Sequence, residues 1–250
     1  MSDAVDNGAS AEPETVTSYS VAADGVALIR LERPRARNAI NTQMLGELLE
    51  HLAVARGDDA VRVLVISSSD QMGLSAGADV REELDHDGHV RRMEMFSDLY
   101  DTIVAFPKPT VAACHGDVVG GGAEISIACD LRVGGANLRM RFPGAALGMP
   151  VGPARLVTLC GLAAAKYLLL TSRTVGADEA LRLGLVNRVA PAAATEESAL
   201  ALAASVAAHP PEAVARLKRM LHEWDDIEGR SAAEGVGQIE HVRSGPGFPG

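Results

Sequence analysis

The sequence of 250 residues contains little cysteine and no excess of positive charge. Its three cysteines, Cys114, Cys129 and Cys160, are odd in number and lack metal-ligand spacing, which argues against a disulfide framework and against a zinc site. Each lies among apolar residues, so we expect buried thiols in a reducing compartment, the cytoplasm. The 23 Lys and Arg are outnumbered by 33 Asp and Glu, a net charge of −10. This balance argues against a nucleic-acid partner, which would require a basic face.

Long apolar runs are also missing. No run approaches the roughly 20 residues that a membrane-spanning helix requires. The first fifteen residues contain neither a basic stretch nor an apolar core, which argues against a signal peptide. Their small, acidic, Pro- and Gly-containing composition predicts a disordered tail over residues 1–15. The whole chain is 47% hydrophobic and 22% charged, the balance of a globular protein large enough to bury a core.

Hydrophobic patterning predicts alternating strands and helices in the first part of the chain and mostly helices after residue 152. Strands are expected at residues 26–31, 61–67, 110–114, 131–133 and 137–142. Helices are expected at residues 38–57, 90–106, 123–129, 154–160, 163–170, 177–183, 196–208 and 211–224, with Asn41 as a candidate N-cap. This order predicts an α/β fold with a largely parallel sheet, followed by a helical region.

Two loops rich in small residues stand out, Leu74–Asp79 (LSAGAD) and Gly116–Glu124 (GDVVGGGAE). Small residues allow a ligand to approach the backbone closely, and the second loop leads into a helix whose first N–H groups are unpaired. Two such N–H groups that converge on one point would form an oxyanion hole for an acyl oxygen. Either loop alone is more simply explained as a tight turn.

Taken in order and with their flanks, these loops resemble the enoyl-CoA hydratase/isomerase (crotonase) superfamily. The matching segments are 31–34 (LERP), 37–40 (RNAI), 63–67 (VLVIS), 75–79 (SAGAD), 107–113 (PKPTVAA), 120–124 (GGGAE), 129–132 (CDLR), 147–150 (LGMP), 177–180 (ADEA), 184–189 (GLVNRV) and 234–236 (EGV). The resemblance implies a crotonase-like ββα spiral core over residues 16–190. It also implies a helical C-terminal oligomerisation and lid region over residues 191–250, in a homotrimer or hexamer.

The resemblance further implies roles for individual residues. The backbone N–H groups of Ala76 and Gly121 would form the oxyanion hole for a coenzyme A thioester, and Glu124 would be the catalytic carboxylate. The remaining substrate-binding positions that it implies are Arg37, Leu74, Gly77, Ala78, Asp79, Gly120 and Gly144. Arg37 would touch the coenzyme A phosphates, although a solvated loop arginine explains it equally well. For Asp79, capping of the next helix is favoured over chemistry.

One position departs from the family pattern. Hydratases of this family use two glutamates; Glu124 matches one, and Gly144 stands in place of the other. Hydration needs a group that takes a proton from water and a way to deliver one to the α carbon. Either Glu124 does both, another segment contributes a carboxylate, or hydration has been lost. We therefore expect a poor hydratase of simple enoyl thioesters, which Gly144→Glu would improve.

The sequence thus predicts an acyl-CoA-processing enzyme with no metal and no cofactor beyond the thioester itself. Glu124 would be its only retained catalytic glutamate. Hydration, double-bond isomerisation, decarboxylation and thioester hydrolysis all remain open, because each can proceed through the same thioester enolate. A noncatalytic acyl-CoA-binding protein is the rival hypothesis from another functional class.

Overall fold

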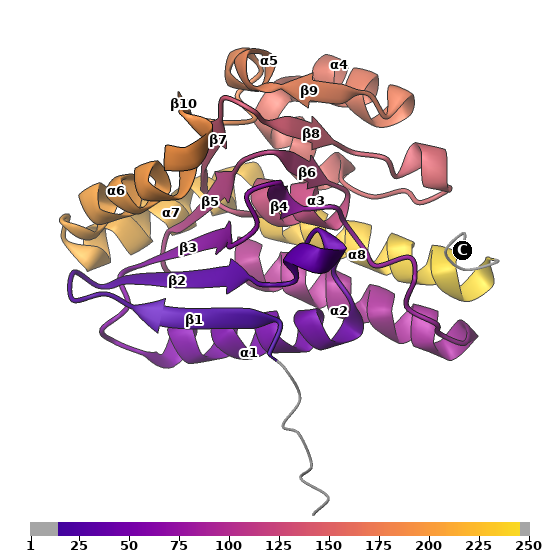
Figure 1. Cartoon of the computed structure of the whole chain (residues 1–250), viewed down its shortest axis with the longest axis horizontal. Helices are drawn as coiled ribbons and strands as arrows, with labels where there is room; N and C mark the ends of the chain where they lie inside the picture. The colour runs from indigo at the N-terminus through magenta and orange to yellow at the C-terminus, as the bar shows by residue number, and fades with distance from the viewer. Residues whose placement is uncertain (1–14, 246–250) are drawn as a thin grey trace, which may run out of the picture.

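The computed structural model describes residues 15–245, which form two sheets surrounded by helices (Figure 1). The larger sheet has the strand order β1-β2-β3-β5-β7-β10 and the smaller has the order β4-β6-β8-β9. The strands are β1 (Thr17–Val21), β2 (Val26–Leu31), β3 (Val63–Ser68), β4 (Gly73–Ser75), β5 (Thr110–Cys114), β6 (Asp117–Val119), β7 (Leu131–Gly135), β8 (Arg139–Arg141), β9 (Thr174–Gly176) and β10 (Arg188–Ala190). Neighbouring strands are parallel, except for the antiparallel pairs β1–β2 and β8–β9.

Helices connect most of the strands, and the described residues after β10 are mainly helical. They are α1 (Thr42–Gly57), α2 (His86–Val104), α3 (Gly121–Ala128), α4 (Pro153–Thr171), α5 (Ala177–Arg182), α6 (Thr195–Ala207), α7 (Pro211–Asp225) and α8 (Ile227–Ser244). Short 3₁₀ turns occur at Pro34–Ala36, Ala145–Leu147 and Ala192–Ala194. Helix α8 runs alongside α2, and α6 covers the larger sheet over β3, β5 and β7 (Figure 1). This mixed α/β architecture confirms the predicted fold class.

Strand β3 is buried on both faces because its alternate side chains enter two different cores. Leu64 and Ile66 belong to the main core, which also contains α1, α2 and α3. Val63 and Val65 belong to a second core, where they pack with the alanines of α6. The continuous β-branched sequence of this strand is therefore the consequence of a sheet that is covered on both sides.

Most predicted elements are confirmed, and the differences have local causes. Helix α1 begins at Thr42 rather than at residue 38, because the Asn41 side chain accepts a hydrogen bond from the N–H of Met44 and caps the helix there. The two predicted helices 154–160 and 163–170 form one element, α4, which is interrupted at Gly161 (φ 75°). Strands β1, β4, β6, β9 and β10 were not predicted; four of these five contain only three residues each.

Helix α8 lies in the predicted helical region 191–250, but its pattern did not predict a separate helix, because three glycines interrupt it. Gly235 permits its close approach to α2: a Cβ there would lie 2.0 Å from Oγ of Ser97. Of the three cysteines, Cys114 and Cys129 are buried as predicted, whereas Cys160 is half-buried. The predicted tail lies almost wholly outside the described residues, and the division into a 16–190 core and a 191–250 region stays a prediction.

Among the described residues, α4 is the one helix whose length and apolar composition would suffice to cross a membrane. Length and composition are weak evidence, because helices of soluble proteins pass the same test. The non-helical backbone at Gly161 lies in the middle of this segment.

Candidate active site

A cavity of about 810 Å³ lies where the predicted loops, the segment 141–151 and helices α2 and α8 meet. The parallel pairing of β4 with β6 brings the two small-residue loops side by side at one end of the smaller sheet. A Cβ on Gly77 would lie 3.5 Å from the backbone nitrogen of Gly121 and 3.0 Å from the carbonyl oxygen of Val119. Gly77 also has φ +98°, so glycine is required there by both space and conformation. The two loops therefore do meet, as the sequence predicted.

The structure changes which backbone N–H of the first loop is available to a ligand. The N–H of Ala76 donates to the carbonyl oxygen of Arg37 at 3.0 Å, so the assignment of Ala76 as a hydrogen-bond donor to substrate is wrong. The carbonyl oxygen of the next residue, Gly77, accepts from the N–H of Ile40, and the N–H of Asp79 donates to the carbonyl oxygen of Ile40. In the described part of the chain these bonds leave the N–H of Ala78, which lines the cavity, without an acceptor.

The second N–H belongs to Gly121, the first residue of α3, where the preceding turn offers no acceptor. Gly120 reaches φ +49°, ψ −118° just before it, a conformation that aims the start of the helix at the cavity. Gly120, Gly121 and Glu124, all named as site residues from the sequence, line the cavity.

Glu124 is 2% exposed, and its Oε2 accepts a hydrogen bond from Nη2 of Arg155 at 3.0 Å. Burial raises the pKa of Glu124 to about 7; Arg155 opposes this rise, and the negative charge of Glu234 adds to it. No hydrogen bond to Oε1 is formed by the described residues, and Gly152 leaves it room: a Cβ there would lie 2.5 Å from that oxygen. Glu124 therefore has one oxygen, Oε1, free of hydrogen bonds to the described residues, and its pKa of about 7 allows it to gain and lose a proton near neutral pH.

Arg155, which the sequence analysis missed, is the centre of this buried cluster. Its guanidinium also bonds Oε1 of Glu234 at 2.8 Å and Oγ of Ser231 at 2.8 Å, and it lies over the ring of Tyr100 at 4.9 Å. Glu234 in turn accepts from the N–H groups of Gly152 and Ala154 and so caps α4. No local pattern could have revealed this cluster, because its members come from four helices.

The mouth of the cavity is basic. It is lined by Arg33, Arg35, Arg37, Arg81 and Arg141, of which the sequence analysis singled out only Arg37. The Arg37 side chain is 59% exposed and has one distant acidic neighbour, Asp117, at 3.7 Å. Despite the net charge of −10, this opening therefore offers several cations to an anionic ligand.

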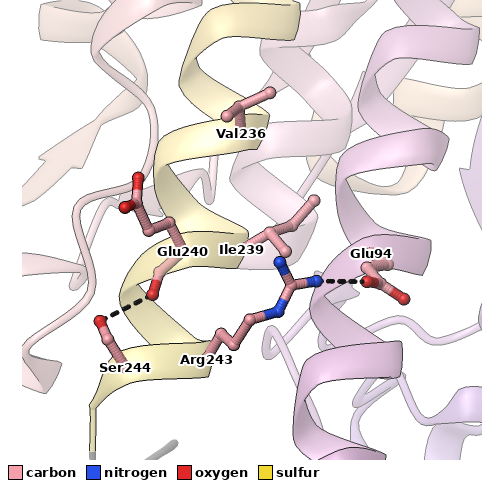
Figure 2. A pocket seen from close by; sticks show the side chains of 6 residues that line it. All are labelled: Glu94, Val236, Ile239, Glu240, Arg243 and Ser244. Atoms are coloured by element: carbon pink, nitrogen blue, oxygen red, sulfur yellow. Dashed lines mark hydrogen bonds and ion pairs between the residues drawn. The ribbon is translucent and has the colours of Figure 1, made fainter.

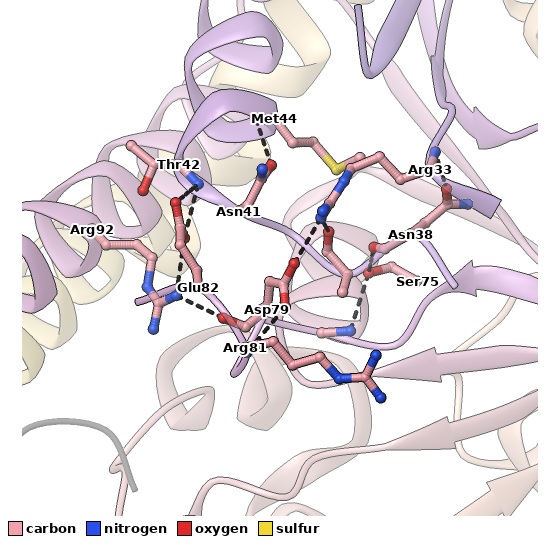
Figure 3. A network of polar contacts seen from close by, with 12 residues as sticks. Arg33, Asn38, Asn41, Thr42, Met44, Ser75, Asp79, Arg81, Glu82 and Arg92 are labelled. Carbon is pink, nitrogen blue, oxygen red and sulfur yellow. Dashed lines mark hydrogen bonds and ion pairs between the residues drawn. The ribbon is translucent and has the colours of Figure 1, made fainter. Parts of the chain in front are cut away.

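Asp79 has a structural role different from the predicted one. It does not cap α2; Asp85 does, by accepting from the N–H of Gly88 at 2.7 Å. Instead the Asp79 carboxylate pairs with Arg33 at 2.9 Å and accepts from the N–H of Arg81 at 3.1 Å (Figure 3). Glu82 pairs with Arg92 and with the N–H of Thr42 in the same network. Asp79 and Glu82, the two acidic residues at the mouth, therefore hold the loop after β4 in place by these contacts.

Two further predictions are corrected. Leu74 is fully buried in the main core and is not part of the cavity wall, so it supports the loop rather than the ligand. Gly144 does line the cavity, but a Cβ on it would lie 2.4 Å from the carbonyl oxygen of Met149. Because backbone atoms cannot yield cheaply, no side chain fits there, and Gly144→Glu cannot restore a carboxylate without moving the segment 143–151.

Helix α8 closes the cavity beside α2 and contributes Gln238 to its wall. Figure 2 shows the outer side of the same helix pair, a shallow groove that the ion pair between Arg243 and Glu94 crosses at 3.2 Å. The groove is lined by exposed or half-buried side chains, unlike the enclosed cluster around Arg155. Between residues 15 and 245, no group of three or more His, Cys, Asp or Glu is arranged to hold a metal ion.

Comparisons with known proteins agree with this geometry. The family model described as enoyl-CoA hydratase/isomerase matches residues 22–234. The 2,3-dehydroadipyl-CoA hydratase of Escherichia coli is 34% identical over 205 residues, which cover 81% of this chain and 80% of that protein. The short-chain-enoyl-CoA hydratase of Clostridium acetobutylicum is 31% identical, covering 79% of this chain and 77% of that protein.

Solved structures show the same fold. The crystal structure of an enoyl-CoA hydratase from Bacillus anthracis superposes with a TM-score of 0.81 at 27% identity, covering 91% of this chain and 90% of that one. An enoyl-CoA hydratase/isomerase from Xanthobacter autotrophicus gives a TM-score of 0.84 at 26% identity, covering 94% and 89%.

Proposed function

Because this chain belongs to the enoyl-CoA hydratase/isomerase family, we propose that it is an enzyme that forms and reprotonates the enolate of an acyl-CoA thioester, with Glu124 as its proton-transferring group. The observation that carries the proposal is the state of Glu124. It is the one carboxylate of the cavity wall, within the described residues, that is not committed to holding the mouth, and its pKa is raised to about 7 by burial.

The N–H groups of Ala78 and Gly121 would bind the thioester oxygen. Both lie on the cavity wall, on loops that approach within van der Waals distance. Negative charge on that oxygen grows as the enolate forms, so fixed donors there stabilise the transition state more than the ground state. Loss of one such donor typically costs about 2.7–4 kcal/mol of transition-state stabilisation. The arginines of the mouth would bind the coenzyme A phosphates.

With a single carboxylate, the simplest chemistry is movement of a proton between carbon and Glu124. The free Oε1 would remove a proton from a carbon next to or conjugated with the thioester carbonyl, and the electrons would move to the thioester oxygen. The protonated Glu124 would then return the proton to either end of the enolate. Return to the far end of a conjugated enolate shifts a double bond. Return to the α carbon exchanges the α hydrogen once the proton on Glu124 has been replaced by one from solvent, and neither outcome needs another acid or a cofactor.

The test is exchange of the α hydrogens of butyryl-CoA in D₂O, followed by mass spectrometry, together with isomerisation of a 3-enoyl-CoA. Glu124→Gln should lower both rates by roughly 10²–10⁴-fold, the usual contribution of an acid–base group, while leaving thioester affinity within a few-fold. Glu94→Gln, on the outer face of α2, is the matched control and should leave both unchanged. Thioester binding without exchange in the wild type would instead establish a noncatalytic acyl-CoA-binding protein.

A further inference from the structure

Two polar groups in the cavity wall beside Glu124 have no hydrogen-bond partner in the described part of the chain. Tyr100 of α2 is 4% exposed, and no described residue hydrogen-bonds to its hydroxyl. Gln238 of α8 is 1% exposed, and its Oε1 is buried and unpaired. A buried unpaired oxygen such as that of Gln238 is rare in folded proteins, because it forfeits its hydrogen bonds to water.

The orientation of the Gln238 amide is fixed by its neighbour. Nε2 donates to Oε1 of Glu234 at 2.6 Å, and the opposite orientation would place two oxygens against each other. Since Glu234 holds the nitrogen, Oε1 is the end of the amide that is left without a partner. It can only accept hydrogen bonds, so it selects an O–H or N–H group.

Both groups are linked to Glu124 through the cluster around Arg155, Tyr100 directly and Gln238 through Glu234. Glu234 accepts from Gln238 and from Arg155, and the same Nη2 of Arg155 bonds Glu124. The Tyr100 ring lies under the Arg155 guanidinium, and its hydroxyl is 3.5 Å from the position that a Cβ on Gly121 would take. Tyr100, Gln238 and Glu124 therefore present three polar groups around one region of the cavity, next to the start of α3.

We propose that Tyr100 and Gln238 hold the water molecule that adds to an enoyl thioester, a task that a second glutamate cannot perform here because Gly144 admits no side chain. The inference rests on the proposed enolate chemistry of Glu124 and assigns it a hydration reaction. One hydrogen of the water would bond Oε1 of Glu124 and the other Oε1 of Gln238. The Tyr100 hydroxyl would donate to one lone pair, which leaves the second lone pair for the β carbon.

The step balances with one carboxylate. The water oxygen forms a bond to the β carbon while its O–H bond breaks and that proton passes to Glu124. The electrons of the double bond move into the thioester enolate, held by the two backbone N–H groups. Protonated Glu124 then gives the proton to the α carbon, which restores the carboxylate. Tyr100 and Gln238 gain and lose no proton; they orient the water.

The experiment compares hydration of crotonyl-CoA with α-hydrogen exchange of butyryl-CoA in the same preparations. Gln238→Met keeps the length of the side chain without the amide oxygen, and Tyr100→Phe removes only the hydroxyl. Each should lower the ratio of hydration to exchange roughly 10- to 100-fold, mainly in kcat, because a hydrogen bond to the reacting water is lost. Val242→Ala, buried on the same face of α8 but absent from the cavity wall, is the structural control and should leave the ratio unchanged.

The outcomes separate this inference from the proposed function. Equal losses of hydration and exchange in the Gln238 and Tyr100 variants, or no change in the ratio, would overturn the water-holding role. Exchange without any hydration in the wild type would overturn it as well, while leaving the enolate chemistry of Glu124 standing. A wild type that binds the thioesters but catalyses neither reaction would overturn the proposed function itself.

Discussion

At the scale of single residues, one guanidinium serves two buried carboxylates. Arg155 bonds both Glu124 and Glu234, so the cluster retains one negative charge more than it can neutralise. Glu234 also accepts hydrogen bonds from two backbone N–H groups at the start of α4. The pKa of Glu124 is raised to about 7, chiefly by burial, and the negative charge of Glu234 adds to the rise. The buried cluster that joins α3, α4 and α8 is therefore also the arrangement that raises the pKa of Glu124.

A pH profile tests this arrangement. Glu124 must be ionised to accept a proton, so kcat/KM for α-hydrogen exchange should rise between about pH 6 and 8 and then level off. Glu234→Gln removes the charge that adds to the elevation, so the rise should move to lower pH. A profile already flat at pH 6 would contradict the assignment. The raised pKa also implies a stabilising contribution that is complete below the unfolded value and is lost as pH rises through about 7.

Arg37 permits a test of the basic mouth. Arg37→Ala should weaken binding of a coenzyme A thioester by about 1 kcal/mol, or roughly fivefold in Kd, because an exposed charge is partly screened. The effect should shrink as salt is raised from low to physiological strength in a calorimetric titration. Arg139→Ala is a matched control, since Arg139 also pairs with Asp117 but is not part of the cavity wall. Equal affinities of both variants would make Arg37 an ordinary surface residue.

At the scale of elements, the segment 143–151 is closed so tightly that glycine is needed at its first bend. The N–H of Met149 donates to the carbonyl oxygen of Gly144 at 2.7 Å, and the carbonyl oxygen of Met149 turns back toward the Cα of Gly144. Gly144→Ala should therefore destabilise the protein by about 1–3 kcal/mol in urea unfolding. Gly46→Ala, in open space on α1, should stabilise it by up to about 1 kcal/mol. If Gly144→Ala left the free energy of unfolding unchanged, the segment 143–151 would have to shift without cost, which would contradict this interpretation.

Helix α7 is anchored to the core through Asp130. Asp130 accepts from Lys218 at 2.7 Å and lies 3.4 Å from His222, both of which project from α7; it also accepts from the N–H and the hydroxyl of Thr110. Glu228, at the start of α8, lies 3.3 Å from the other ring nitrogen of His222. The hydrogen bond to Asp130 raises the pKa of His222, against the effect of burial and of the nearby Lys218.

The sign of this shift sets the expected pH dependence of stability. A raised histidine pKa contributes stability that is complete below the unfolded value of 6.5 and is lost as pH rises through the folded value. His222→Gln should therefore cost about 1–2 kcal/mol at pH 6 and distinctly less at pH 8.5, as measured by urea unfolding at each pH. The same cost at both values would show that the histidine contributes through packing and not through its charge.

At the scale of the whole molecule, α7 presents an apolar stripe to solvent. Leu217, Leu221 and Trp224 follow one another at the spacing of a single helix face and are 60%, 61% and 76% exposed. A stripe of this kind is typical of a surface that another chain covers. The family resemblance makes a homotrimer, or a hexamer of paired trimers, the expected assembly.

Light scattering tests the assembly directly. We expect the wild type to be oligomeric, and Leu217→Glu with Leu221→Glu to shift it to a smaller species, because buried unpaired charge opposes association. Val54→Glu, an exposed apolar position on α1, is the control and should leave the mass unchanged. A monomeric wild type would contradict the proposal.

The sequence by itself determined the features that depend on neighbouring residues. Asn41 caps α1, the β-branched run of β3 is buried on both faces, and the small-residue loops lead to a ligand cavity. Caps, strand periodicity and glycine turns act over a few residues, so their signals can be read directly. The same motifs identified the family and placed Glu124 in the cavity.

Only the tertiary structure decided how the site is completed. It assigned the free N–H to Ala78 rather than Ala76 because a carbonyl oxygen from residue 37 occupies the latter. It placed Arg155 and Glu234 beside Glu124, although they lie 31 and 110 positions away along the chain. These outcomes depend on the pairing of β4 with β6 and on the packing of α8 against α2, contacts between distant segments that no local pattern encodes. The glycine at position 144 is likewise explained only by the tertiary structure, because the carbonyl oxygen of Met149 occupies the space that a side chain would need.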